Sequence, residues 1–377
     1  MLTTPTPDLS RVMVPVDVPG TERTEKMLGE FIAIAASGSV AYCKDWHIDR
    51  CATLKGLYTV PACFRDDWLN WYWQEVVPNV DPTAPEDDYS FCYIGTKGSS
   101  TGFHHDVVYS YSWSVSLQGV KRWKLWPNEG QREDPYVEVL QQPGDAIFVP
   151  SGCYHEVENI AAQTGTGTGT GESELVVSIN RNWFNGFCIR KVFAFLKREH
   201  DSVQRELMDV FKPPPTSASA SASSATVLMP PEEWYSHCDV ILRANAAMNW
   251  QMFLCLVTAR VLLMETFLYD NNQSNLNLKG PSLFCEKYTP VLTEEQRDIM
   301  TLQRATAIPD IRSATCDDSG DDSRAATVWE YTRGELLAVL KSIRKDSELL
   351  EALTFIYDRP QHHVDEALGE LCSCLII

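Results

Sequence analysis

The spacing of hydrophobic residues changes once along the chain, near Asn185. Before this point, hydrophobic and polar residues alternate in short stretches separated by Gly and Pro, as strands do. Gln118-Gly119 separates two such stretches and signals a hairpin. The predicted strands are 89–94, 107–117, 120–126, 136–140, 146–149, 155–160 and 175–179. Seven or more short strands with Gly/Pro turns favour a double-stranded β-helix, the jelly-roll or cupin barrel.

Beyond Asn185 the hydrophobic period becomes that of an amphipathic helix. Helices are expected over 189–211, over 232–269 with a break near Asn249, and over 328–357. Ahead of the barrel, we expect an irregular start over 1–25, a helix over 24–36 and a strand over 39–44. The predicted fold is mainly β with α, a barrel core between N-terminal elements and a helical C-terminal region. The predicted divisions are an N-terminal region 1–87, a barrel 88–190, a helix 191–212, a linker 213–230 and a helical region 231–377.

Three stretches have compositions that build no core. The TGTGTGTG repeat at 164–171 is expected to be a surface loop, and the Pro/Ser/Ala run at 213–225 a disordered linker. The tract 270–327 is polar and acidic, and we expect a loop there. Its Asp cluster lacks the spacing and closing Glu of an EF-hand, which favours a solvated tract over a calcium site.

The net charge of −19 argues against direct binding to DNA and is compatible with a basic protein partner. The longest hydrophobic run, 252–268, is interrupted by Arg260 and Glu265, so we expect a buried helix and no membrane span. No basic and hydrophobic leader opens the sequence, which predicts a cytoplasmic or nuclear protein. Cys374 begins a CLII ending, but the residues before it are acidic and disfavour a lipid anchor. The twelve cysteines follow no framework and are expected to be reduced.

The candidate chemistry lies in two motifs of the predicted barrel. His104 and Asp106 form a His-x-Asp pair at a strand end, and His155 follows a Pro-Gly-Asp turn, a hydrophobic strand and a second turn. Two imidazoles and one carboxylate on one face are the ligands of non-haem Fe(II) oxygenases. We therefore predict His104, Asp106 and His155 as catalytic metal ligands. Strand alternation is expected to turn His105 away from the metal, and His47 is assigned to core packing with its aromatic neighbours.

Lys121, on the strand after the metal-bearing one, is open to two interpretations. It is either an exposed hairpin lysine beside Arg122 or a buried ammonium that pairs with the distal carboxylate of a dicarboxylate co-substrate. Thr101 and Ser114, on spacing, could add hydroxyl groups to the same co-substrate, and Tyr93 is a weaker candidate.

The order of these motifs resembles the jumonji-C family of 2-oxoglutarate oxygenases. The resemblance runs through KDWH, FRDDWLNWYW, DYSFCYIGTKGS, HHDVVYSYSWSV, GVKRW, PGDAIFVPSG, SINRNWFNGF and EEWYSHCDVILR, in order, over about 40–270. It implies Fe(II), 2-oxoglutarate and O2 as cofactor and co-substrates, with ascorbate supporting activity. It also implies that Lys121 and Thr101 hold 2-oxoglutarate, that Ser114 stands where some relatives have Asn, and that Asn180 points into the same cavity.

The SYSWSV and SINRNWFNGF motifs are similar to those of one subgroup of this family. That similarity implies hydroxylation of a lysyl residue in the class-1 translation release factor. Three alternatives stay open: an N-methyl-lysine demethylase, a catalytically silent cupin that binds a protein partner, and a zinc cupin isomerase or hydrolase. The short segment before Pro143-Gly144-Asp145 and the stretches 164–171 and 270–327 depart from the family pattern, which bears on substrate identity more than on the chemistry.

Overall fold

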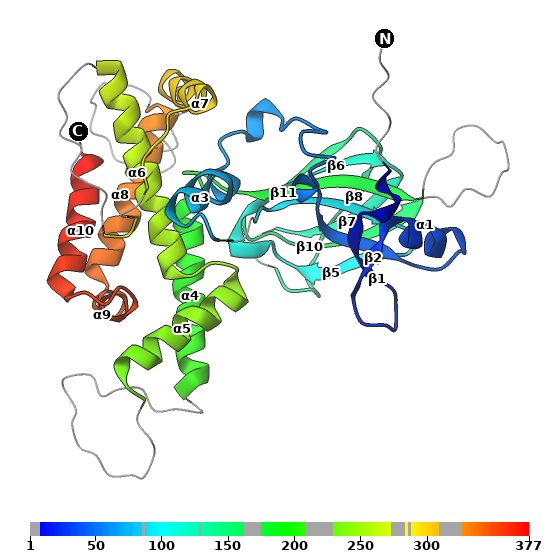
Figure 1. The fold of residues 1–377 in the computed structure, drawn as a ribbon, viewed down its shortest axis with the longest axis horizontal. Helices are drawn as coiled ribbons and strands as arrows, with labels where there is room; N and C mark the ends of the chain where they lie inside the picture. The colour runs from blue at the N-terminus through cyan, green and yellow to red at the C-terminus, as the bar shows by residue number, and fades with distance from the viewer. Residues whose placement is uncertain are drawn as a thin grey trace. The chain divides into compact units, whose positions relative to one another are not determined.

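The structure, a computed structural model, describes residues 8–84, 87–127, 130–161, 175–208, 229–272, 283–285, 288–308 and 326–376. The chain divides into two compact units, one of residues 1–74 and 85–183 and one of residues 75–84 and 184–377. The first unit contains the strands and the second is helical (Figure 1). The predicted repeat loop at 164–171 and the predicted linker at 213–225 lie outside the described residues.

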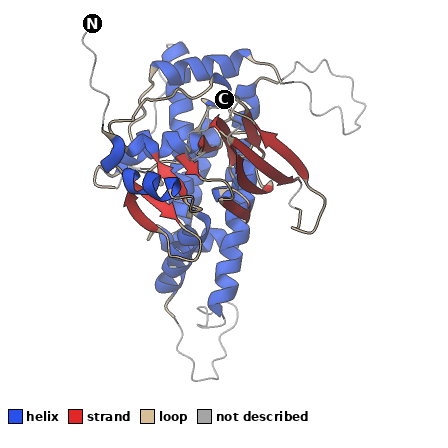
Figure 2. Cartoon of the chain, turned by 90° about the vertical axis from the view of Figure 1, so that its right-hand side faces the viewer, coloured by secondary structure: helices blue, strands red, loops and turns tan. Residues whose placement is uncertain are grey.

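The strands of the first unit form two antiparallel sheets (Figure 2). The strands are β1 (Met13–Asp17), β2 (Thr24–Met27), β3 (Tyr42–His47), β4 (Ser90–Gly95), β5 (Ser100–His104), β6 (Tyr111–Gln118), β7 (Val120–Trp126), β8 (Val137–Gln141), β9 (Ala146–Val149), β10 (Tyr154–Ala161) and β11 (Val176–Trp183). The seven-stranded sheet has the order β2-β1-β3-β4-β11-β6-β9, and the four-stranded sheet has the order β5-β10-β7-β8. The core is therefore the predicted double-stranded β-helix with flanking helices.

The N-terminal segment departs from the prediction, because it extends the larger sheet. Residues 24–27 form β2, and the helix α1 (Leu28–Ala36) is shorter than the helix expected over 24–36. The strand β1 lies in the stretch expected to be irregular. Its Pro15 is paired with Glu25 of β2 and lies outside the pairing with β3, which involves Val16 and Asp17.

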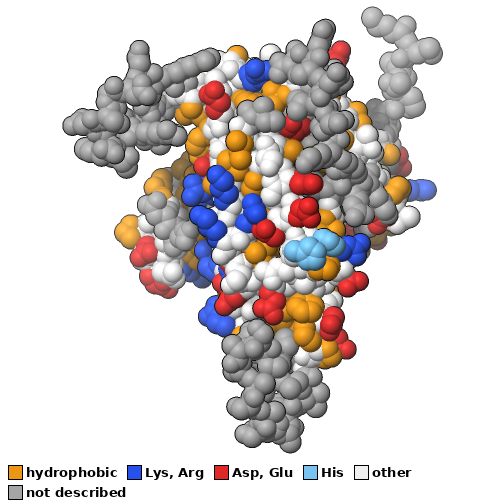
Figure 3. Space-filling model, turned by 90° about the vertical axis from the view of Figure 1, so that its left-hand side faces the viewer, with side chains coloured by type: hydrophobic (Ala, Val, Ile, Leu, Met, Phe, Trp, Pro, Cys, Tyr) orange, Lys and Arg blue, Asp and Glu red, His pale blue; other side chains and the backbone are white. Residues whose placement is uncertain are grey.

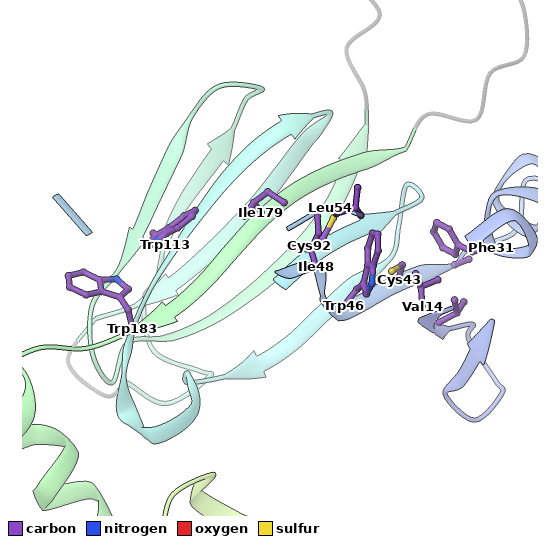
Figure 4. Packing of buried hydrophobic residues seen from close by; sticks show 12 residues of the cluster. Val14, Phe31, Cys43, Trp46, Ile48, Leu54, Cys92, Trp113, Ile179 and Trp183 are labelled. Atoms are coloured by element: carbon purple, nitrogen blue, oxygen red, sulfur yellow. The ribbon is translucent and has the colours of Figure 1, made fainter. Parts of the chain in front are cut away.

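Alternation along the seven-stranded sheet separates its two faces. Large hydrophobic side chains such as Trp113 and Ile179 point to one face and join a buried cluster with Phe31 of α1 and Trp46 of β3 (Figure 4). Burying one side chain of this class stabilises a fold by about 1.5–3 kcal/mol. The intervening residues of β6 and β11 are Ser and Asn, so the opposite face is polar although it is covered.

The second unit consists of helices. They are α3 (Val77–Val80), α4 (Ile189–Met208), α5 (Pro231–Ala246), α6 (Trp250–Asn272), α7 (Glu294–Ala305), α8 (Val328–Lys345), α9 (Ser347–Ile356) and α10 (Gln361–Cys374); the first unit adds α2 (Trp68–Trp71) to α1. The predicted break lies between α5 and α6, where Ala247 has a φ of 61° and Asp239 accepts a hydrogen bond from the Trp250 amide at 3.1 Å. On the face in Figure 3, acidic and basic side chains lie among hydrophobic ones.

The sequence also predicts a buried helix and a loop in the helical region. The segment Trp250–Leu268 of α6 is long and hydrophobic enough to cross a membrane, but 83% of it is buried inside the unit. It is the buried helix predicted from Arg260 and Glu265. Part of the tract expected to be a loop at 270–327 is the helix α7, whose N-terminus is capped by Thr293. The acidic cluster of that tract lies outside the described residues.

Candidate metal and dicarboxylate site

The structure brings the three predicted metal ligands together. His104 is the last residue of β5, Asp106 follows two residues later, and His155 lies opposite His104 on the neighbouring strand β10. Their candidate ligand atoms all lie within 4.8 Å of one another. Residues that are 51 positions apart in the sequence thus meet because β5 and β10 pair in this register.

Backbone carbonyls orient both imidazoles. The Nδ1 of His104 lies 2.8 Å from the Gly102 carbonyl oxygen, and the Nδ1 of His155 lies 3.0 Å from that of Cys153. A carbonyl can only accept, so each Nδ1 carries the proton and each Nε2 keeps its lone pair for a metal. Burial, and then the nearby His155, lower the pKa of His104 to about 4. The ring is therefore neutral at pH 7, as a ligand must be.

The third predicted ligand, Asp106, is held by the opposite sheet. Its Oδ2 accepts a hydrogen bond from Ser112 Oγ at 2.7 Å, and its Oδ1 accepts one from Asn182 Nδ2 at 2.8 Å. Neither Ser112 nor Asn182 was predicted from the sequence. Both lie on the polar face of the seven-stranded sheet, directly opposite each other in the register of β6 and β11.

A tight turn at Val107–Tyr109 carries the chain from β5 to β6, where the sequence predicted that the strand would already have begun. Val108 and Tyr109 have φ angles of 55° and 58°, which are unfavourable for bulky side chains. The turn before His155 holds it: Ser151 Oγ donates to the Tyr109 carbonyl at 2.6 Å, and a Cβ on Gly152 would lie 2.5 Å from the Tyr109 ring. The segments that carry Asp106 and His155 therefore fix each other.

These residues fit an Fe(II) ion. Two neutral imidazoles with free Nε2 atoms and one carboxylate, all converging, form the two-His-one-carboxylate donor set that leaves coordination positions open. Each ligand also has a hydrogen-bond partner behind it, as ligands of protein metal sites do.

Lys121 is a buried cation, which rules out the alternative of an exposed hairpin lysine. It is 1% exposed, and its Nζ donates to Ser178 Oγ at 2.5 Å and lies 5.3 Å from the centre of the Tyr93 ring. No carboxylate forms an ion pair with it among the described residues. Burial lowers the pKa of Lys121 to about 7. A buried ammonium without a counter-ion is costly, so this position favours an anionic ligand.

Ser178 and Asn180 continue from Lys121 as a chain of hydrogen bonds. Ser178 Oγ donates to Asn180 Oδ1 at 2.8 Å, and Ser114 Oγ donates to the same oxygen at 3.1 Å. The Asn180 oxygen is thus occupied by two donors, and Asn180 lines the cavity. Ser114 itself is 1% exposed and lies behind Asn180, away from the cavity lining. Ser114 lies on the same polar face of β6 as Ser112, as the even spacing indicated, but it is not among the lining residues, and its contact with a co-substrate stays a prediction.

Thr101 and Tyr93 also reach the cavity. Thr101 is hydrogen-bonded to the buried Tyr42 hydroxyl, whose pKa burial raises. The Tyr93 hydroxyl donates to Asp45 Oδ1 at 2.7 Å. The predicted ligands and co-substrate residues, Ser114 excepted, line one cavity of about 240 Å³ between the two sheets. Its lining residues are Tyr42, Lys44, Asp45, Phe91, Tyr93, Thr101, His104, His105, Asp106, Val107, Ser112, Lys121, Trp123, His155, Val157, Asn180 and Asn182.

His105 and His47, neither of which was assigned a metal-binding role from the sequence, lie in different places. His105 lines the cavity, with its ring edge-on to Tyr109 and Tyr154, because β5 ends at His104 and strand alternation no longer orients it. His47 lies away from the ligand group, with its Nδ1 3.2 Å from Asp88 Oδ1 and its ring edge-on to Phe91.

The structure brings two histidines, an aspartate and a buried lysine to one cavity of a double-stranded β-helix. This arrangement is typical of non-haem iron oxygenases that use a 2-oxo acid. Sequence comparison agrees. The chain is 30% identical over 269 residues to the 2-oxoglutarate and iron-dependent oxygenase JMJD4 of Gallus gallus, which is 62% of this chain and 54% of that protein. It is 32% identical over 277 residues to the arginine-specific demethylase JMJ20 of Arabidopsis thaliana, covering 63% and 53%.

A third relative is the JmjC domain-containing protein 1 of Schizosaccharomyces pombe, 32% identical over 200 residues that cover 45% of this chain and 39% of that protein. No family model matches the chain. The chain spans about half the length of the JMJD4 and JMJ20 relatives. Over these stretches it is similar to the jumonji-C iron- and 2-oxoglutarate-dependent oxygenases and, among them, to the JMJD4 proteins. Iron and 2-oxoglutarate, predicted above, appear in the names of the JMJD4 relatives, and the donor set fits iron.

Proposed function

We propose that the protein is an Fe(II)- and 2-oxoglutarate-dependent oxygenase that hydroxylates a lysyl residue of a protein, the class-1 translation release factor. One observation supports it above the others: a cavity with a convergent two-His-one-Asp group also contains a buried lysine without a carboxylate partner among the described residues. A silent binding module has no need of both features in one cavity. A zinc isomerase or hydrolase would leave Lys121 without a role.

In this proposal His104, Asp106 and His155 hold Fe(II). Iron and 2-oxoglutarate supply the oxidising chemistry: O2 gives one oxygen atom to a substrate C–H bond and the other to succinate, with loss of CO2. The side chains contribute position. Ser112 and Asn182 fix the Asp106 carboxylate, and the carbonyls behind the two imidazoles fix their tautomers.

The distal carboxylate of 2-oxoglutarate is assigned to Lys121. The Lys121 ammonium, the Thr101 hydroxyl and the Asn180 amide line the same cavity and provide the donors that a carboxylate requires. Ser178 occupies one Lys121 proton and leaves two for the ligand. Trp123, whose ring centre lies 5.7 Å from that of His155, forms a hydrophobic wall on this side and limits access of water.

The substrate assignment is supported by the similarity of motifs and by charge. The acidic chain, at −19, suits a partner with a basic recognition region. A second candidate is N-demethylation, since the name of the Arabidopsis relative specifies demethylation of arginine. Oxidation of an N-methyl C–H bond gives a carbinolamine that releases formaldehyde, so the same cavity would serve either reaction.

The test is a turnover assay with product analysis. The purified chain is incubated with Fe(II), ascorbate and 2-oxoglutarate, with and without recombinant release factor, and succinate and the mass of the factor are measured. A gain of one oxygen on a lysine is expected. His104→Ala should abolish both products, whereas His363→Ala, which removes an exposed histidine of α10, should leave them unchanged.

The outcomes separate the candidates. Loss of a methyl group from a methylated substrate, with formaldehyde, would replace hydroxylation by demethylation. Absence of succinate from a protein that retains iron and 2-oxoglutarate would remove the oxygenase proposal itself.

A further inference from the structure

Asp45 has a backbone conformation that its strand does not require. It lies in β3, whose pairing with β4 shifts register between Cys43 and Trp46, and its φ is +58°. Such a bulge redirects a side chain, and a positive φ costs energy even for Asp. From the sequence, His47 of this segment was assigned, with its aromatic neighbours, to core packing, and Asp45 was given no role. Trp46 is buried in the core as expected, but Lys44 and Asp45 line the cavity.

Two side chains hold the bulge in place. Arg23 donates from Nη1 to Asp45 Oδ2 at 2.9 Å and from Nη2 to the Lys44 carbonyl at 2.6 Å. Tyr93 donates its hydroxyl to Asp45 Oδ1 at 2.7 Å. The carboxylate is therefore fixed at one position, and each of its oxygens retains a lone pair for a further donor.

Charge in the cavity makes Asp45 the acceptor for a cation. Of the described residues that line the cavity, two are acidic, Asp45 and Asp106. Asp106 belongs to the metal-ligand group and accepts hydrogen bonds on both oxygens. Lys44 and Lys121 are the basic lining residues, and neither can receive a cation. A positively charged side chain that enters this cavity is left with Asp45 as its partner.

Asp45 also lines a second groove, next to the cavity. This groove has room for the backbone of a substrate chain outside the cavity. A groove of about 510 Å³ is lined by Asp45 together with residues of β1, β3 and their neighbours, including Arg23, His47 and Arg50. Inside the cavity, the rings of Phe91 and Tyr93 lie two residues apart on β4 and offer a hydrophobic wall to an aliphatic stem.

We infer that Asp45 is a specificity-determining residue, which receives the ammonium or guanidinium group of a substrate side chain whose stem packs against Phe91 and Tyr93. This inference rests on the proposed function and names the residue that selects a cationic side chain for the cavity. Arg23 is then a positioning residue, since it acts by holding the bulge.

Binding measurements test the inference without turnover. Fifteen-residue peptides of Gly, Ser and Ala with Lys, Arg, norleucine or Gln at the centre are titrated into the protein in the presence of Mn²⁺ and 2-oxoglutarate. Norleucine retains the stem of lysine and lacks its charge. Asp45→Asn removes the carboxylate charge and tolerates the positive φ. Asp17→Asn is the matched control, because Asp17 lies 3.9 Å from the same Arg23 but does not line the cavity.

Wild type and Asp17→Asn should bind the lysine peptide about tenfold more tightly than the norleucine peptide, the size expected for one hydrogen-bonded charge pair. In Asp45→Asn the two affinities should become equal, while the 2-oxoglutarate affinity stays within about twofold of wild type because Asp45 does not contact Lys121 or the metal ligands. Equal preference for lysine in Asp45→Asn and wild type, or no preference in wild type, would overturn the inference.

Failure of the proposed function has a different signature. It would appear as an absence of succinate when the wild-type protein is incubated with Fe(II), whatever the peptide affinities. A protein that discriminates lysine through Asp45 but forms no succinate would keep the inferred recognition and lose the oxygenase.

Discussion

Among the described residues of the first unit, one Arg and one Lys side chain, Arg181 and Lys121, are buried, and their surroundings differ. Arg181 of β11 is 8% exposed and pairs with Asp67, Nε to Oδ2 at 2.8 Å; burial lowers its pKa, but the Asp67 carboxylate more than offsets this, so the pKa is raised. Lys121 of β7 is 1% exposed, has a hydroxyl as its hydrogen-bond partner, and has a lowered pKa. A buried charge with its counter-ion stabilises the fold, whereas one without a counter-ion leaves a binding requirement. The difference separates a structural cation from a functional one.

The largest expected effect is on stability, and it differs between the two positions. Arg181→Met leaves Asp67 buried without its partner and should lower the free energy of unfolding by about 3–5 kcal/mol. Lys121→Met removes an uncompensated charge and should leave stability unchanged or raise it by about 1 kcal/mol. Urea unfolding of both variants checks this, with half-exposed Arg122→Met as the control. Equal destabilisation by Arg181→Met and Lys121→Met would erase the distinction.

The second effect is on co-substrate affinity. Lys121→Met should weaken 2-oxoglutarate binding by about 2–3 kcal/mol, or roughly 30- to 150-fold, because a charged hydrogen bond to its carboxylate is lost. Calorimetry in the presence of Mn²⁺ measures the affinity, and Lys124→Met, on the same strand, should change it less than about twofold. Unchanged affinity in Lys121→Met would assign the distal carboxylate to another residue.

The smallest effect is on pH dependence. With the pKa of Lys121 lowered to about 7, the ammonium form that attracts a dicarboxylate predominates below pH 7. Above pH 7, the 2-oxoglutarate affinity should fall by up to about tenfold per pH unit, since binding must take up a proton. Affinity measured from pH 6 to 9 checks this slope, and Lys121→Met should remove it.

The same shift predicts the sign of the stability change. Between its ordinary pKa and about 7, the unfolded chain binds the Lys121 proton and the folded chain does not. The contribution of Lys121 to stability therefore falls as the pH falls through that window and is constant below it. Arg181 titrates in neither range and should give no such slope.

The sequence predicted the β-helix core and the ligand positions because strand alternation and the His-x-Asp and Pro-Gly-Asp motifs are local patterns. It did not predict β1 and β2, whose pairing depends on distant partners, or the turn at 107–109, where Val108 and Tyr109 adopt positive φ angles opposed to their propensity. Ser178, Asn182 and Asp45 were missed for a related reason: single polar residues gain a role only when the sheets bring them to one cavity.

Gly152 shows that a residue outside the ligand group can determine the position of a predicted ligand. It neither binds metal nor lies on a strand, yet its φ is +76° and any Cβ would enter the Tyr109 ring. A substitution that displaces this ring also displaces the turn beginning at Asp106. In genetic terms, Gly152→Ala should behave as a null allele, whereas Gly102→Ala, whose Cβ would meet nothing within 4 Å, should be tolerated.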